Sequence, residues 1–97
     1  MSASTSLPKW KATAKFQWRT WGDECAIYNT ASGDTHILDL TSGQILKILE
    51  EQAADVPNLV EASAAKLRLD ADPGFVDRIE QLVAKFQDLD LIEPVIQ

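Results

Sequence analysis

The sequence changes its hydrophobic period once, near residue 39, and this change constrains the fold more than any other feature. Phe16, Trp18 and Thr20 alternate with polar residues, a period of two that is typical of a half-buried strand. From residue 45 onward the apolar residues instead recur at the spacing of a helix. A chain of 97 residues has room for one domain. The pattern therefore predicts a single α+β domain in which strands come first and helices follow.

Three short strands are expected, at residues 14–20, 24–29 and 35–38. Two turns separate them, one at Gly22-Asp23 and one around Gly33-Asp34, where glycine suits a positive φ. Short connections between consecutive strands favour antiparallel pairing of neighbours. The prediction is a three-stranded antiparallel meander.

Three helices are expected after the meander, each with a start signal and an apolar stripe. The start signals are Asp39, Thr41 or Ser42 for the first helix, Pro57 for the second, and Asp72 with Pro73 for the third. The stripes are Ile45, Leu46, Ile48 and Leu49; then Leu59, Val60, Ala64 and Leu67; then Val76, Ile79, Leu82, Val83 and Phe86.

The two ends of the chain are expected to be less regular. Residues 1–12 are mostly small and polar and predict a flexible N-terminal arm, with residues 13–97 forming the domain. Residues 91–95 predict an extended tail, because Pro94 disfavours helix at the residue before it. Either the arm or the tail is a candidate to cover the free side of the first strand.

The charge balance narrows the choice of partners. Fifteen acidic and nine basic residues give a net charge of -6, which argues against nucleic acid and against an anionic membrane surface. No apolar run approaches the roughly 20 residues of a membrane helix, and residues 1–11 lack the apolar stretch of a signal peptide. The single cysteine excludes an internal disulfide. A cytoplasmic location is the expectation.

The residues that usually carry chemistry are too few for an active site. His36 and Cys25 are the only histidine and cysteine, both lie on predicted strands, and a zinc site needs about four ligands. No phosphate-binding glycine motif is present. We therefore predict no enzyme, no catalytic residue, no metal site and no cofactor. Cys25 and the tryptophans Trp10, Trp18 and Trp21 are expected to pack in the core.

The third strand has an unprotected edge. Proteins usually protect an open edge with charge or proline, and Thr35-His36-Ile37-Leu38 carries neither. An open edge beside an apolar helix is a ready site for a peptide that adds as a further strand. The tail or a second copy of the chain is the alternative occupant of this edge.

Five segments, in their order and spacing, resemble the PqqD-like peptide chaperones, and in particular the subgroup associated with a relative of the HPr serine kinase. The similarity covers residues 16–94, and residues 28–38 are its most specific part. The segments are Trp18-Arg19-x-Trp21, Ile27-Tyr28-Asn29, Ser32-Gly33-Asp34-Thr35-His36-Ile37-Leu38, Ile45-Leu46 and Leu91-Ile92-Glu93-Pro94.

The resemblance implies a winged helix-turn-helix-like domain that recognises the leader of a ribosomally synthesised precursor peptide. It implies that the leader pairs as an antiparallel strand with the third strand, in a groove closed by the third helix. The domain would deliver the leader to a modifying enzyme, or to a kinase-related protein of the same system, and do no chemistry. The implied peptide-binding residues are Asp34, Thr35, His36, Ile37, Leu38, Arg78, Ile79, Leu82, Val83, Lys85 and Phe86.

Two other functions stay open at this point. A winged-helix DNA-binding protein has the same topology, although the second helix offers only Lys66 and Arg68 near its end, beside Glu61. A structural subunit that forms a homodimer through the open strand would use the same backbone groups as peptide binding.

Overall fold

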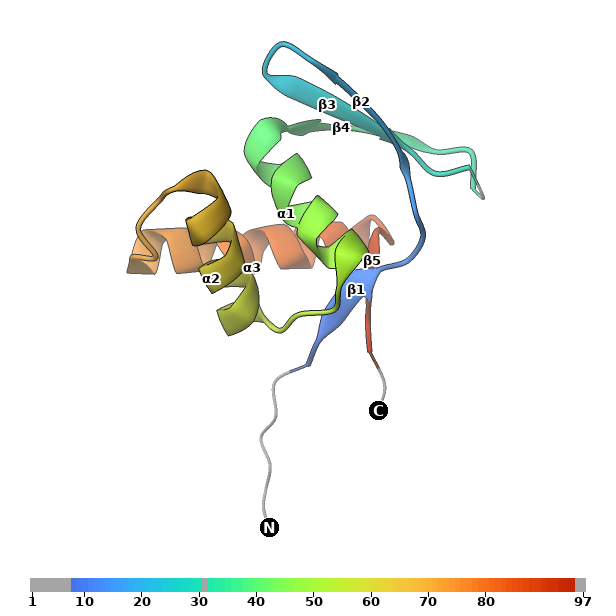
Figure 1. Ribbon diagram of the computed structural model, residues 1–97. Coiled ribbons are helices and arrows are strands. Elements are labelled where there is room, and N and C mark those ends of the chain that lie inside the picture. The colour runs from blue at the N-terminus through green and yellow to red at the C-terminus, as the bar shows by residue number, and fades with distance from the viewer. Residues whose placement is uncertain (1–7, 31, 96–97) are drawn as a thin grey trace.

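The computed structural model describes residues 8–30 and 32–95 and shows an α+β fold (Figure 1). An antiparallel meander is followed by three helices, in an arrangement compatible with a winged helix. The predicted fold class and the predicted order of elements are confirmed. The meander consists of β2 (Gln17–Trp21), β3 (Glu24–Tyr28) and β4 (Thr35–Asp39), and the helices are α1 (Leu40–Glu51), α2 (Val56–Leu67) and α3 (Pro73–Asp88).

The meander has the order β2-β3-β4, so β3 is central and the other two strands are edges. Its two turns contain Gly22 and Gly33, with φ values of 58° and 82°, which glycine adopts without strain. In the second turn the Gly33 N–H donates to the Asn29 carbonyl at 2.7 Å. The Asn29 N–H donates in turn to the Asp34 carbonyl at 2.9 Å. This last hydrogen bond closes the β3–β4 hairpin and fixes its register.

Each helix begins after an aspartate whose carboxylate accepts a hydrogen bond from a backbone N–H in the first turn. The predicted caps Asp39 and Asp72 are confirmed, and Asp55 is a third cap that the sequence analysis did not identify. The donors are Ser42 at 2.7 Å, Asn58 at 2.9 Å and Phe75 at 2.8 Å.

A second, two-stranded sheet joins the two ends of the domain. Strand β1 (Trp10–Ala12) pairs antiparallel with β5 (Ile92–Pro94), and Trp10 also bridges to Ala54 in the connection between α1 and α2. Residues 10–12 of the expected arm therefore form a strand, and the tail pairs with them instead of covering β2 or β4. Strands of three residues carry too short a pattern to be recognised from hydrophobic period. Residues 1–7 of the expected arm lie outside the described residues.

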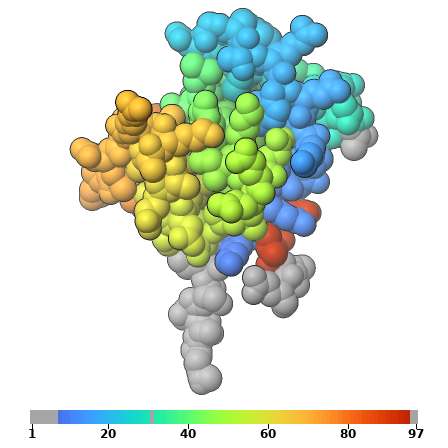
Figure 2. All heavy atoms as spheres, viewed as in Figure 1, coloured from blue at the N-terminus to red at the C-terminus, as the bar shows by residue number. Residues whose placement is uncertain are grey.

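The core lies among the three helices, the inner face of the meander and β5. Helix α1 packs against the inner face of the meander and against α2, and α3 packs against α2 and β5 (Figure 1). Figure 2 shows α1 and α2 side by side on the surface. The predicted apolar stripes are buried, except that Leu67 and Val76 are half-buried. The fully buried apolar side chains are Ile27, Ile45, Leu46, Leu49, Leu59, Ile79, Phe86 and Leu91.

The three tryptophans differ in how far their side chains are buried. Trp10 and Trp18 are half-buried against the core, and the Trp18 Nε1–H donates to a carboxylate oxygen of Glu50 at 3.1 Å. The expectation that Trp21 packs in the core is wrong, because its side chain is 52% exposed. Residue 21 lies on the face of the sheet that points away from α1, since strand side chains alternate between faces.

Candidate functional site

The outer edge of β4 is open in the described part of the chain, where β4 pairs only with β3. The Asn29–Asp34 hydrogen bond sets which backbone groups point outward, because hydrogen-bonded and non-hydrogen-bonded pairs alternate along an antiparallel ladder. His36 and Leu38 thus direct their backbone groups toward β3. Thr35 and Ile37 direct their N–H and C=O groups away from the sheet.

The side chains of β4 alternate between the inner and the outer face of the sheet. Leu38 is 4% exposed and belongs to the core, while His36 is half-buried on the same inner face. Ile37 is 54% exposed on the outer face. Asp34 and Thr35, at the start of the strand, are exposed. The strand therefore offers an exposed backbone edge whose inner side lies beside the core.

Helix α3 supplies fewer accessible side chains than the sequence analysis expected. Ile79 and Phe86 are fully buried among core residues, so they have no surface for a peptide to contact. Val83 is 6% exposed. Arg78 and Lys85 are exposed, at positions that border the same side of the helix. The stripe of residues 79, 82, 83 and 86 mainly holds α3 in the fold.

A hollow of about 350 Å³ lies between the end of β4, the start of α1 and the middle of α3. It brings together the predicted residues Arg78, Leu82 and Lys85. The sequence did not predict the three other lining residues, Asp39, Ser42 and Gln81. Gln81 could have been found, because it lies three residues after Arg78 and four before Lys85 on the same helix. The lining residues are Asp39, Ser42, Arg78, Gln81, Leu82 and Lys85.

Asp39 connects the two sides of this hollow. Its carboxylate accepts the hydrogen bond from the Ser42 N–H, and its Oδ2 lies 3.6 Å from Nη2 of Arg78. Hydrogen bonding from the backbone and then the side chain of Ser42, followed by the nearby charges of Arg78 and Lys85, lowers the pKa of Asp39 below its ordinary value. Asp39 is therefore ionised at neutral pH and partly neutralises the basic side of the hollow.

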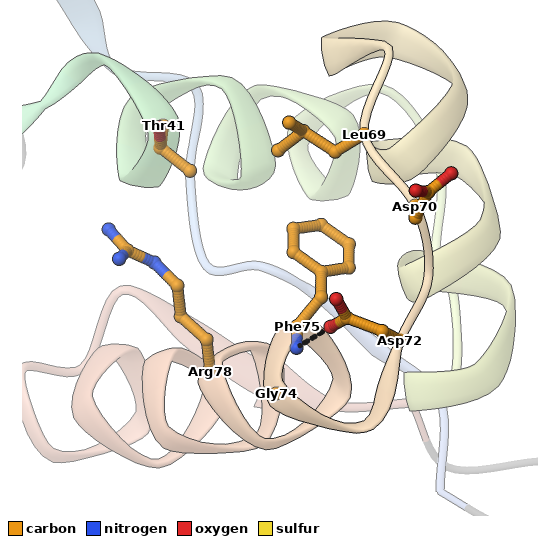
Figure 3. Close-up of a pocket in the computed structure, with 7 residues that line it drawn as sticks. All are labelled: Thr41, Leu69, Asp70, Asp72, Gly74, Phe75 and Arg78. Atoms are coloured by element: carbon orange, nitrogen blue, oxygen red, sulfur yellow. Dashed lines mark hydrogen bonds between the residues drawn. The ribbon is translucent and has the colours of Figure 1, made fainter.

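A second hollow, of about 490 Å³, continues along α3 on the other side of Arg78 (Figure 3). In Figure 3 the Phe75 ring points into the space between α1 and α3, and Arg78 stands at the border of that space opposite Thr41. The two hollows lie along α3 on either side of Arg78, which lines both, and are together called the groove. The second hollow is lined by Thr41, Leu69, Asp70, Asp72, Gly74, Phe75 and Arg78.

Cys25 packs as a small apolar side chain. It is 3% exposed beneath α1, where Gly43 lies directly against its Sγ. Burial raises the pKa of the Cys25 thiol, so the thiol is protonated at neutral pH. Within residues 8–30 and 32–95 no cluster of three or more Cys, His, Asp or Glu side chains has the arrangement to hold a metal ion. In the same residues no helix is both long and apolar enough to cross a membrane.

The arrangement of strands and helices is similar to that of TbiB1, whose solved structure is a complex with the TbiA(beta) leader peptide. The two share 20% sequence identity with a TM-score of 0.66, over 90% of this chain and 99% of that chain. At this level of identity the similarity shows a common fold. No family model matches the chain, and no curated protein sequence matches it.

Proposed function

We propose that this protein is a non-catalytic binding module that captures the leader of a ribosomally synthesised precursor peptide as an added strand on β4. The observation that carries the proposal is the open outer edge of β4 beside the hollow that Leu82 and Arg78 line. An edge alone also fits aggregation or dimer formation. An edge next to a hollow that accepts side chains fits a peptide better, because the hollow adds specificity.

Each part of the site has a separate task in this proposal. The outward N–H and C=O groups of Thr35 and Ile37 bind the peptide backbone irrespective of its sequence. The hollow beside α3 receives the peptide side chains that point to the inner side of the sheet. Ile79 and Phe86 support the groove from beneath and do not touch the peptide.

Two lines of support favour a leader peptide over other peptides. The fold is shared with TbiB1, which binds the TbiA(beta) leader peptide. The segments within residues 16–94 resemble the PqqD-like peptide chaperones. We therefore propose that the bound leader is presented to a modifying enzyme, or to a kinase-related protein of the same system, in the cytoplasm.

The proposal is tested by titrating the ¹⁵N-labelled protein with synthetic peptides that cover candidate precursor leaders. We expect saturable chemical-shift changes at residues 34–39 and at Arg78, Leu82 and Lys85. Changes confined to the outer face of the sheet, around Trp21 and Arg19, would contradict the proposed placement.

A homodimer paired through β4 is the second candidate, because the same outward backbone groups would form a continuous sheet across two copies. Sedimentation over a range of protein concentrations separates the two functions. Peptide capture predicts a monomer, or a dimer that the leader peptide dissociates. A dimer that is unaffected by a saturating excess of every candidate leader would favour the structural role.

A further inference from the structure

Resting on the proposed strand addition, we infer that the bound peptide carries an apolar residue with an acidic residue two positions away. The apolar side chain lies on Leu82 and the carboxylate lies at Lys85. Both contacts belong to the 350 Å³ hollow between β4 and α3. The inference thus assigns a residue pattern to the ligand.

The direction of the side chains follows from the register of β4. Peptide residues paired with Thr35 and Ile37 point to the outer face, as those residues do. The residues between them, opposite His36 and Leu38, point to the inner side. The residue opposite Leu38 lies next to Asp39, the β4 residue that lines the hollow. Only every second peptide residue therefore meets α3, whichever way the peptide runs.

The spacing of the two α3 contacts fits this alternation. Leu82 and Lys85 are three residues apart on a helix, which places their Cβ atoms about 5–6 Å apart. Side chains on one face of a strand repeat about every 6.8 Å. An apolar residue on Leu82 thus brings the side chain two positions away to the level of Lys85.

The charged groups of the hollow favour a negatively charged side chain on the peptide. Arg78 already faces the carboxylate of Asp39 at 3.6 Å, and a second carboxylate there would be repelled by Asp39. Among the described residues no carboxylate lies within 4.0 Å of the Lys85 ammonium. Lys85 is therefore the basic group of the hollow that is available to an acidic ligand.

The net charge of -6 favours basic ligands at long range, which opposes the preference for an acidic residue at Lys85. At physiological salt, however, interactions between exposed charges are screened beyond about 8 Å. A carboxylate held within about 4 Å of Lys85 senses that lysine much more strongly than the distant acidic surface. The local contact therefore determines the preferred sequence, and the net charge mainly affects the rate of encounter.

Three fluorescein-labelled heptapeptides in a threonine host, each with leucine at the centre, test the pattern by fluorescence polarisation. The first has glutamate two residues from leucine on both sides. The second has the glutamates directly beside leucine, which turns them to the outer face at the same net charge. The third has glutamine two residues away. We expect the first to bind about twofold to fivefold more tightly than the other two, and this advantage to fall with salt.

Lys85→Gln should abolish that advantage. Lys66→Gln is the matched control, because Lys66 and Lys85 both lie in the last turn of a helix and the two variants have the same net charge. The first peptide should keep its advantage in Lys66→Gln. An advantage that survives Lys85→Gln, or equal binding by the two glutamate peptides, would overturn the inference.

Chemical shifts distinguish this failure from failure of the proposed function. If the three peptides bind equally and all shift residues 35–39, strand addition stands and the acidic pattern is refuted. If no peptide shifts residues 35–39 at millimolar concentration, both strand addition and the pattern are refuted.

Discussion

Phe86 shows how burial separates fold residues from site residues. Its side chain is fully buried, so Phe86→Ala should lower the free energy of unfolding by about 3–5 kcal/mol. Urea denaturation measures this loss, and Phe86→Leu should cost clearly less because it leaves a smaller cavity. A loss below about 1 kcal/mol for the alanine variant would contradict this burial and would indicate that Phe86 is exposed in the groove.

Gly43 shows a close approach between α1 and the sheet. A Cβ at this position would meet the Sγ of Cys25, so Gly43→Ala should destabilise the protein by about 1–3 kcal/mol despite the higher helix propensity of alanine. Gly74→Ala in the first turn of α3 is the matched control. Its nearest neighbour, an Asp72 carboxylate oxygen at 3.5 Å, leaves room for the methyl group, so this change should be neutral or stabilising.

The same contact predicts an interaction between two substitutions. Cys25→Ala removes the sulfur that the new methyl group would meet. Gly43→Ala should therefore cost at least 1 kcal/mol less in the Cys25→Ala background than alone. Equal costs in both backgrounds would show that the Cys25 contact is not the cause.

Asp39 gives the stability a pH dependence of known sign. Its pKa is lower in the folded than in the unfolded protein, mainly because of the Ser42 hydrogen bond, so the folded state binds fewer protons in acid. Asp39 therefore stabilises the fold fully above its unfolded pKa, about 3.9, and this contribution is lost as pH falls through the lower folded pKa. The stability difference between the protein and Asp39→Asn should shrink from pH 7 to acid, because asparagine keeps the cap without the charge. A difference independent of pH would contradict this account.

At the scale of elements, the two sides of β4 have different roles. Ile37→Pro removes an N–H that points outward, where proline is tolerated in an edge strand. His36→Pro removes an N–H that points toward β3. We expect His36→Pro to cost about 1–3 kcal/mol more in unfolding free energy than Ile37→Pro.

Ile37→Pro should remain folded by circular dichroism and lose leader binding. Retained binding in a folded Ile37→Pro would contradict strand addition at this edge.

The elements differ in how far the sequence predicts them. The helices were predicted because Asp39 and Asp72 are local caps and because the apolar stripes are long. The meander was predicted from the period of two and from the turns at Gly22 and Gly33. The β1–β5 pair was not predicted, because each strand has three residues and its partner is about 80 residues away in sequence. Trp21 was misplaced because the expectation followed its aromatic character, whereas the alternation that puts Trp18 on the inner face puts residue 21 on the outer face.

The site was only partly predictable for related reasons. The open edge at 35–38 followed from the number of strands. The outward direction of Thr35 and Ile37 depends on the hydrogen bond that closes the hairpin, which the sequence pattern does not give. Likewise, apolar spacing identified Leu82 and Phe86 together, while tertiary packing decides that only Leu82 reaches the hollow.

At the scale of the whole molecule, the charge and the topology point to different partners. The winged-helix-like arrangement is one that DNA-binding proteins also use. With nine basic and fifteen acidic residues, however, phosphate backbones would be repelled at long range. Lys66 and Arg68 at the end of α2 are too few to offset this repulsion. The open edge of β4 and its hollow therefore fit a peptide better than a nucleic acid.

Strand addition on β4 is tested most directly by backbone hydrogen exchange, measured by NMR with and without a bound leader peptide. In the free protein the Thr35 and Ile37 amides should exchange readily, and the His36 and Leu38 amides should already be protected by their bonds to β3. With peptide, the first pair should become protected in proportion to the fraction bound, while the second pair changes little. If a peptide binds at saturation and the Thr35 and Ile37 amides still exchange as in the free protein, strand addition on β4 is wrong.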